Sequence, residues 1–146
     1  CIAVPTLVAY DALWLEGKAL GLGPAEFDKI DVVRSGGLRS LEIMRDAGLP
    51  MAFGTDLLGE LRKYHCMEFE LLARVLTPAE IIRSVTVVGA DLARMPGTLG
   101  RIAEGAHADM IVVDGNPLDD IALLEGDGAN FPLIMRGGTV FKDRLG

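Results

Sequence analysis

The acidic residue best placed to do chemistry is Asp56, which follows Gly54 and Thr55 directly after an apolar run. That run, residues 49–53, has the pattern of a buried parallel strand. A carboxylate at the C-terminal end of such a strand lies where (β/α) barrels place their catalytic groups. The alternative interpretation is that Asp56 only ends the strand or caps the next turn, as aspartate commonly does.

Few other groups could contribute to a site. Tyr10 and Asp11 lie just past the first apolar run, on the same rim as Asp56, and are candidates to contact a substrate. The two histidines, His65 and His107, have neither His-x-His spacing nor a position at a strand end. Because one histidine cannot make a metal site by itself, we expect His65 at a surface or pocket rim and His107 facing solvent.

Composition narrows the classes of partner. A net charge of −7 and a pI of about 4.7 argue against nucleic-acid binding, which needs clustered Lys and Arg. No apolar run reaches the roughly 18–20 residues of a membrane helix. Cys1 and Cys66 lack Cys-x-x-Cys spacing. We therefore expect Cys66 to pack as a small apolar residue on a helix, and the protein to be cytoplasmic.

The elements that must position this acid have the pattern of two strand–helix units. We expect a strand over residues 2–8 with an edge or bend at Pro5, followed by an irregular loop with a helical turn over 10–23. A helix should begin at Pro24, and the glycine pair at 36–37 predicts a kink or a break in it. The connection is long enough for a right-handed parallel crossover between the two strands.

The second half of the chain is expected to change from helices to strands. Thr77 and Glu80 form a capping box that should start a helix, and Gly137-Gly138 indicates a hairpin. The composition shift near Pro96 marks the expected domain boundary. The remaining predicted elements are helices near 65–75 and 90–95, and strands near Ile102 and over 110–113, 133–135 and 139–142.

The stretch that begins at Gly97 has a distinctive order of residues: G-T-L-G-R-I-A-E-G-A-H-A-D-M-I-V-V-D. It resembles the closing β-segment of metal-dependent amidohydrolases, and the upstream F-G-T-D resembles the end of the eighth barrel strand in that superfamily. The resemblance implies an α/β fold: the last two βα units of a TIM-like (β/α)8 barrel in residues 1–95, and the C-terminal strands of a small composite β-sandwich in 96–146. It also gives Asp109 a structural role, in which its carboxylate satisfies turn amides.

The same resemblance implies a role for Asp56. In these enzymes a divalent metal, often zinc, activates a water. The strand-eight aspartate contacts the metal, takes a proton from that water and delivers it to the leaving nitrogen; Asp56 is the matching position. The other ligands of the family are a His-x-His on the first strand, a lysine or glutamate on the fourth, and histidines on the fifth and sixth. None can be matched here, so we expect zinc in the complete enzyme and no metal in this chain alone.

Within the superfamily, G-T-D-L-L-G followed by M-E-F-E-L resembles the prolidase-like branch, which cleaves Xaa-Pro or Xaa-Arg dipeptides. Imidazolonepropionases and cyclic-amide hydrolases share the same endings. The resemblance therefore implies a small substrate with an amide bond, such as a dipeptide or an N-acyl amino acid.

Two functions remain open. The chain can be the C-terminal part of a metal-dependent hydrolase of C–N bonds, or, as it stands, a non-catalytic structural or interaction module. Its start on an apolar run at Cys1 suggests truncation. A truncated barrel would leave unpaired strand edges, and the mean hydropathy of +0.34 fits uncovered apolar faces. We expect its partner to be the rest of the enzyme or a second copy of the chain.

Overall fold

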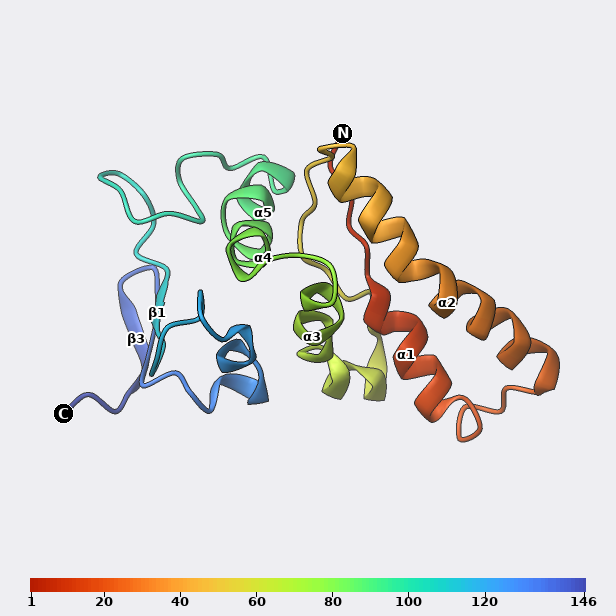
Figure 1. Cartoon of the computed structure of the whole chain (residues 1–146). Coiled ribbons are helices and arrows are strands. Elements are labelled where there is room, and N and C mark those ends of the chain that lie inside the picture. Colours follow the sequence, from red (N-terminus) through yellow and green to blue (C-terminus); the bar gives the residue numbers. More distant parts are fainter.

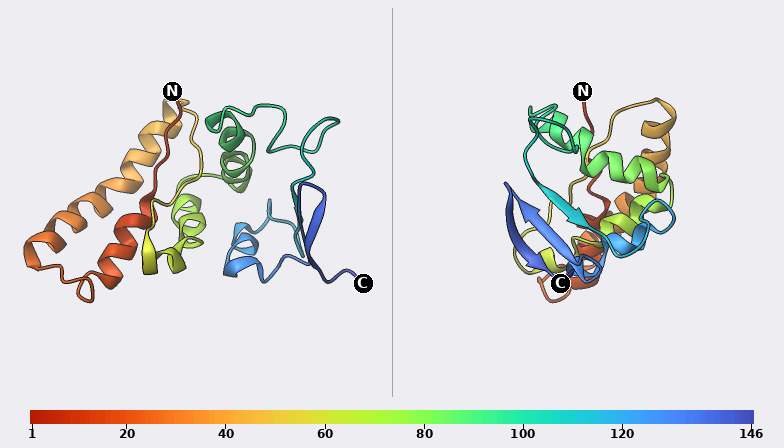
Figure 2. Two further views of the ribbon diagram at one scale, coloured as in Figure 1. Left: turned by 180° about the vertical axis from the view of Figure 1, so that it is seen from behind. Right: turned by 90° about the vertical axis from the view of Figure 1, so that its left-hand side faces the viewer.

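The computed structural model describes residues 1–146. Helices make up the N-terminal part, and a three-stranded sheet lies beside them toward the C-terminus (Figure 1). Figure 2 shows the strands as a layer of their own, with the helices behind them. None of the helices combines the length and the apolarity needed to cross a membrane.

Two extended segments lie side by side, as the sequence predicts, but they pair only briefly. A parallel bridge joins Ala3 to Met51. The Ala3 amide donates to the carbonyl of Pro50, and the Ala52 amide donates to the carbonyl of Ala3, each at 2.9 Å. The predicted parallel direction is confirmed, but both predicted strands are reduced to this bridge.

The first segment ends early because the chain turns into helix α1 (Leu7–Glu16). Pro5 has no amide to donate to a neighbouring strand, and Thr6 adopts the left-handed region with a φ of 50°. The prediction of an irregular loop over residues 10–23 is wrong for its first part, because α1 occupies it. The chain becomes irregular only after this helix ends.

Helix α2 (Pro24–Asp46) begins at the predicted residue and is continuous, so the predicted break at Gly36-Gly37 is wrong. The second glycine serves packing instead. A Cβ on Gly37 would lie 2.9 Å from the side chain of Leu7. The absence of a side chain there lets α1 lie closely against α2 (Figure 1).

Four shorter helices follow. They are the 3₁₀ helix η1 (Gly59–Tyr64), α3 (Met67–Ala73), α4 (Pro78–Val85) and α5 (Val87–Leu92). The predicted capping box at the start of α4 is confirmed. The Glu80 amide donates to the hydroxyl of Thr77 at 3.3 Å, and the Thr77 amide donates to the carboxylate of Glu80 at 2.7 Å.

The C-terminal strands form an antiparallel sheet in the order β1-β2-β3. They are β1 (Met110–Val112), β2 (Leu133–Arg136) and β3 (Thr139–Asp143). Gly137 and Gly138 have φ values of 55° and 80°, which confirms the predicted hairpin with a primed turn. The Gly137 amide donates to the Asp109 carboxylate at 2.6 Å, so the expected structural role of Asp109 is confirmed. The strand predicted near Ile102 is wrong: the segment is irregular and Ile102 is 89% exposed.

The apolar core joins the helical part to the C-terminal part. Its larger cluster draws on α2, on the segment from α3 to α4, and on a 3₁₀ helix, η2 (Ile121–Leu124), from the connection between β1 and β2. This cluster consists of Leu41, Leu72, Leu76, Ile81, Ile121 and Leu124. A smaller cluster, Val8, Ala12, Leu57 and Leu71, packs α1 against α3. The insertion of η2 therefore docks the C-terminal part on the helices.

One carboxylate is buried within the helical part. Glu68 on α3 is 0% exposed, and its two oxygens accept hydrogen bonds from the amides of Leu7 and Val8 at 3.2 and 2.7 Å. These amides begin α1, whose preceding residue, Thr6, provides no side-chain cap. Glu68 thus caps α1 from another helix. Burial raises the pKa of Glu68 to about 7, although the two amide hydrogen bonds oppose this shift.

Stability should depend on pH through Glu68. The ordinary pKa of this carboxyl is 4.5 and its pKa in the folded chain is about 7, so the folded state favours the neutral acid. The stabilising contribution is complete below pH 4.5 and is lost as the pH rises through 7. Because of this carboxyl, we expect the free energy of unfolding to fall by about 2 kcal/mol as the pH rises from 5 to 8.

Urea unfolding of Glu68→Gln at both pH values tests this expectation. The amide does not titrate, so the variant should lose this part of the pH dependence. At pH 5 it should also be less stable by about 1–3 kcal/mol, because its NH₂ group faces a backbone donor. Glu60→Gln, which changes an exposed carboxyl on η1, is the matched control and should keep the dependence. An identical pH slope in Glu68→Gln and the unmodified chain would contradict the assignment.

A second prediction concerns the larger apolar cluster. Leu41 is fully buried, and Leu41→Ala should lower the free energy of unfolding by about 2–5 kcal/mol through lost burial and a cavity. Leu58 is 79% exposed, so Leu58→Ala should change it by less than about 0.5 kcal/mol. Denaturant unfolding of both variants measures the contrast, and equal effects would show that the cluster is not the core.

Candidate functional site

Asp56 lies at the end of the second extended segment, beside the first. The two segments approach closely at Gly54, where a Cβ would collide with the side chain of Val4. Any other residue there would force the side chain of Val4, or one of the segments, to move. The sequence Gly54-Thr55-Asp56 is thus placed beside the end of the neighbouring segment, as the pattern of paired parallel strands predicts.

The backbone conformation of Asp56 sets the direction in which its side chain leaves the main chain. Asp56 has a φ of 51°, in the left-handed region, and Thr6 at the end of the neighbouring segment has nearly the same value. Such values are uncommon for residues other than glycine, and they often occur at functional sites. Both segments therefore turn sharply where they end.

The carboxylate of Asp56 is exposed and takes part in no hydrogen bond or ion pair of the structure. An aspartate that caps a turn would accept a hydrogen bond from a nearby backbone amide, and Asp56 accepts none. Its oxygens are therefore free to bind a cation or a proton.

The loop after Asp56 is fixed to α1 by a partly buried cluster of polar groups. The Glu16 carboxylate accepts a hydrogen bond from the Tyr64 hydroxyl at 2.6 Å and pairs with the Lys63 ammonium at 2.5 Å. Hydrogen bonds from Lys63 and then from Tyr64 lower the pKa of Glu16. These contacts hold η1 against α1.

Tyr10 and Asp11 lie on α1 and line a cavity of about 530 Å³ between α1 and α2. Asp56 is not among the residues that line this cavity, so the structure does not bring the three candidates into one pocket. Asp11 is already engaged: one of its oxygens accepts from the Nη2 and Nε atoms of Arg34 at 2.7 and 3.0 Å. Arg34 also lies 4.8 Å from the ring centre of Trp14.

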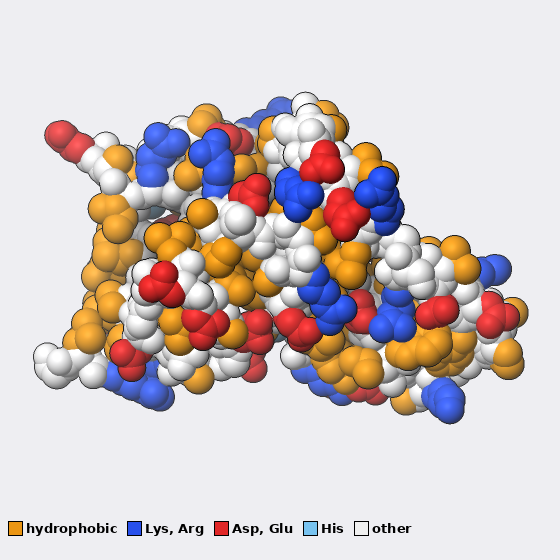
Figure 3. All heavy atoms as spheres, viewed as in Figure 1, with side chains coloured by type: hydrophobic (Ala, Val, Ile, Leu, Met, Phe, Trp, Pro, Cys, Tyr) orange, Lys and Arg blue, Asp and Glu red, His pale blue; other side chains and the backbone are white.

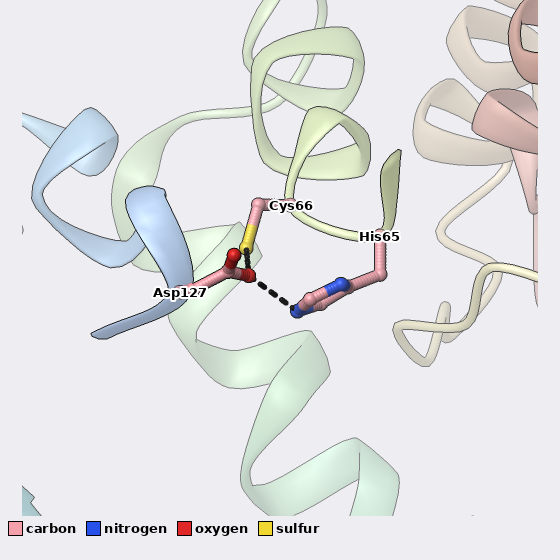
Figure 4. Close-up of side chains that lie close together, drawn as sticks. All are labelled: His65, Cys66 and Asp127. Atoms are coloured by element: carbon pink, nitrogen blue, oxygen red, sulfur yellow. Dashed lines mark hydrogen bonds and ion pairs between the residues drawn. The ribbon is translucent and has the colours of Figure 1, made fainter. Parts of the chain in front are cut away.

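A second group of polar side chains was not predicted from the sequence. His65 and Cys66 immediately precede α3, and Asp127 belongs to the 3₁₀ helix η3 (Gly126–Gly128). Their side chains point toward one another (Figure 4). The Asp127 Oδ1 atom lies 3.4 Å from His65 Nε2 and 3.8 Å from Cys66 Sγ. We call these three residues the His65 cluster.

His65 and His107 are both exposed, as predicted. Cys66 is half-buried at the start of α3, and its thiol faces the carboxylate of Asp127. The prediction that Cys66 packs as a small apolar residue is therefore wrong.

Known proteins resemble this chain in both sequence and fold. The Amidohydrolase family matches residues 4–140. An amidohydrolase of known crystal structure shares 51% sequence identity with this chain. The two structures superpose with a TM-score of 0.94, over 100% of this chain and 35% of the other. The crystal structure of a prolidase complexed with N-methylphosphonate-L-proline is 44% identical, with a TM-score of 0.91 over 98% of this chain and 35% of that one.

A curated relative, the ochratoxinase of Aspergillus niger, is 27% identical over 132 residues, which are 89% of this chain and 27% of that protein. The chain thus spans about a third of the matched structures and about a quarter of this relative. The structural matches confirm the α/β fold class expected from the sequence. With nearly all of its residues matched, the chain belongs to the amidohydrolase family.

Proposed function

We propose that this chain forms the C-terminal part of a metal-dependent hydrolase that cleaves amide or peptide bonds. The observation that carries the proposal is the free carboxylate of Asp56, at the end of the second of two neighbouring parallel segments. The family match includes this position. The likeness to an amidohydrolase and to a prolidase supports a reaction at a C–N bond.

Asp56 fits the role of a metal ligand. Zinc takes carboxylate oxygens at about 2.0–2.2 Å, and a catalytic zinc commonly has three protein ligands. Of these ligands, this chain supplies only Asp56 itself. His65 belongs to its own cluster, and His107 lies in an exposed loop. In our proposal, residues outside these 146 provide the other ligands. When bound, the divalent metal, zinc in this proposal, lowers the pKa of a water.

Asp56 would also carry a proton. Its carboxylate accepts a proton from the attacking water while the water oxygen forms a bond to the amide carbon. It then donates that proton to the leaving nitrogen as the C–N bond breaks. The exposed, unpaired state of this carboxylate supports both steps, because no ion pair has to be broken first.

The substrate class we propose is a dipeptide or an N-acyl amino acid. The similar prolidase structure contains N-methylphosphonate-L-proline, which supports a small substrate with an amino-acid carboxyl end. Tyr10 and Asp11 remain candidates for contact with that substrate. Of the two, Tyr10 has the freer side chain, because the carboxylate of Asp11 is paired with Arg34.

A second candidate function is a non-catalytic structural or interaction module. Large apolar side chains that remain exposed favour it, among them Val32, Leu58, Ile102 and Phe141. Figure 3 shows apolar side chains gathered along the sheet and over α1 and α2. In either function we propose that these faces are covered by the rest of the enzyme or by a second copy of the chain.

Replacement of Asp56 tests the catalytic proposal. In the complete enzyme, Asp56→Asn should keep the fold but lower turnover of dipeptides by about 10²–10⁴-fold, because the amide cannot accept the proton. Steady-state hydrolysis assays measure the loss, and circular dichroism checks the fold. Glu60→Gln, a nearby exposed carboxyl, should hydrolyse dipeptides at the unmodified rate. Unchanged turnover in Asp56→Asn would contradict the catalytic role of Asp56, whereas a complete protein that hydrolyses no amide substrate would favour the interaction module.

The state of association is a separate prediction. Exposed apolar faces and short unpaired strand edges should make the 146-residue chain associate with itself. Sedimentation velocity should then show species larger than 15.6 kDa. A stable monomer that unfolds in a two-state transition would contradict this expectation.

A further inference from the structure

The His65 cluster brings together three different metal-binding groups from two distant parts of the chain. An imidazole nitrogen, a thiol sulfur and a carboxylate oxygen all lie within 4.8 Å of one another. His65 and Cys66 come from the junction of η1 and α3, and Asp127 comes from η3 (Figure 4). No other set of three such groups in the chain lies so close together.

The ring of His65 is oriented by a backbone contact. Its Nδ1 atom lies 2.8 Å from the carbonyl oxygen of Arg62. A carbonyl oxygen only accepts hydrogen bonds, so Nδ1 must carry the hydrogen in this contact. In the neutral ring, Nε2 then presents its lone pair. Metal-binding histidines characteristically donate their second ring N–H to such a backbone carbonyl.

The lone pair of Nε2 faces a second electron-rich atom. Asp127 Oδ1 lies 3.4 Å from it, and the sulfur of Cys66 lies 3.8 Å from the same oxygen. With the neutral ring, two acceptors face each other, an arrangement that favours a cation between them. A proton on Nε2 would meet this need with an ion pair, and a metal ion would meet it with all three groups.

We propose that the His65 cluster binds a divalent zinc-type ion, separate from any metal at Asp56. Zinc bond lengths of about 2.0–2.3 Å in a tetrahedron place neighbouring ligand atoms roughly 3.3–3.6 Å apart. The observed 3.4 and 3.8 Å are close to these values, and the third pair, the imidazole nitrogen and the thiol sulfur, lies within 4.8 Å and would draw together on binding. The mixture of nitrogen, sulfur and oxygen donors suits zinc and excludes calcium and magnesium, which take oxygen ligands.

The exposure of His65 and Asp127 leaves a fourth position open to water. A bound ion would connect α3 to η3 and thereby hold the C-terminal part on the helices, beside the apolar contact made by η2. This differs from the expectation that the chain alone holds no metal. Asp127 and Cys66 are 61 residues apart in the sequence, so spacing in the sequence could not reveal their contact.

Zinc titration of the chelator-treated 146-residue chain tests the proposal. Calorimetry should show one bound ion per chain. Cobalt substitution should give a sulfur-to-metal charge-transfer band and the intense visible bands of tetrahedral coordination. His65→Gln, Cys66→Ser and Asp127→Asn should each weaken binding by more than about tenfold, because loss of a group that only orients a ligand already costs roughly 10–100-fold in metal affinity.

Three matched variants identify the site. Cys1→Ser removes the other thiol, His107→Gln the other imidazole, and Asp56→Asn the carboxylate of the proposed active site. All three should bind zinc like the unmodified chain. Retained binding in Asp56→Asn separates this proposal from the proposed hydrolase function, so that each can fail alone.

Thermal unfolding provides a second readout. Saturating zinc should raise the unfolding midpoint of the unmodified chain but not that of Asp127→Asn, because a ligand stabilises only the state that binds it. Asp127 is exposed, so its replacement should leave the fold intact in circular dichroism. Absence of stoichiometric zinc binding would overturn the proposal. Loss of binding in Cys1→Ser or His107→Gln, with binding kept in the cluster variants, would also overturn it.

Discussion

The buried carboxylate of Glu68 holds α1 on α3, and the position of the candidate site depends on that contact. The first amides of α1 need acceptors, and the side chain of Thr6, which is turned into the left-handed region, supplies none. Glu68 supplies both oxygens from the interior. The start of α1 follows directly on the segment that pairs with Met51. This one carboxylate therefore helps to fix the direction in which the first segment meets the segment that ends at Asp56.

Local signals in the sequence predicted local structure well. The capping box of Thr77 and Glu80 and the hairpin at Gly137-Gly138 each depend on residues within a few positions of one another, and both are present. The predictions that fail depend on tertiary contacts. Gly37 favours a helix break by intrinsic propensity, but the packing of Leu7 against it keeps α2 continuous. The segment at Ile102 is apolar, but it pairs with no other strand.

The candidate site could be predicted only where a motif marks it. Asp56 follows a recognisable apolar run and glycine, so its place at the end of a segment was foreseeable. Glu68 and Asp127 act on partners about 60 residues away, and no spacing indicates such contacts. A weaker signal for Glu68 exists, because it lies three and four positions before Leu71 and Leu72 and so shares their buried helix face.

The main chain alone determines where the carboxylate of Asp56 stands, and this has an evolutionary consequence. The close approach of Gly54 to Val4 and the left-handed turn fix the position, while no hydrogen bond of the side chain contributes. Exchange of this residue for asparagine or glycine, which the left-handed region tolerates, would cost the fold little. Under the proposed function, selection for the reaction would then be what retains aspartate at this position. In a diverging lineage, the identity of this residue would, under the proposed function, record whether catalysis was still under selection, while the surrounding scaffold persisted for other reasons.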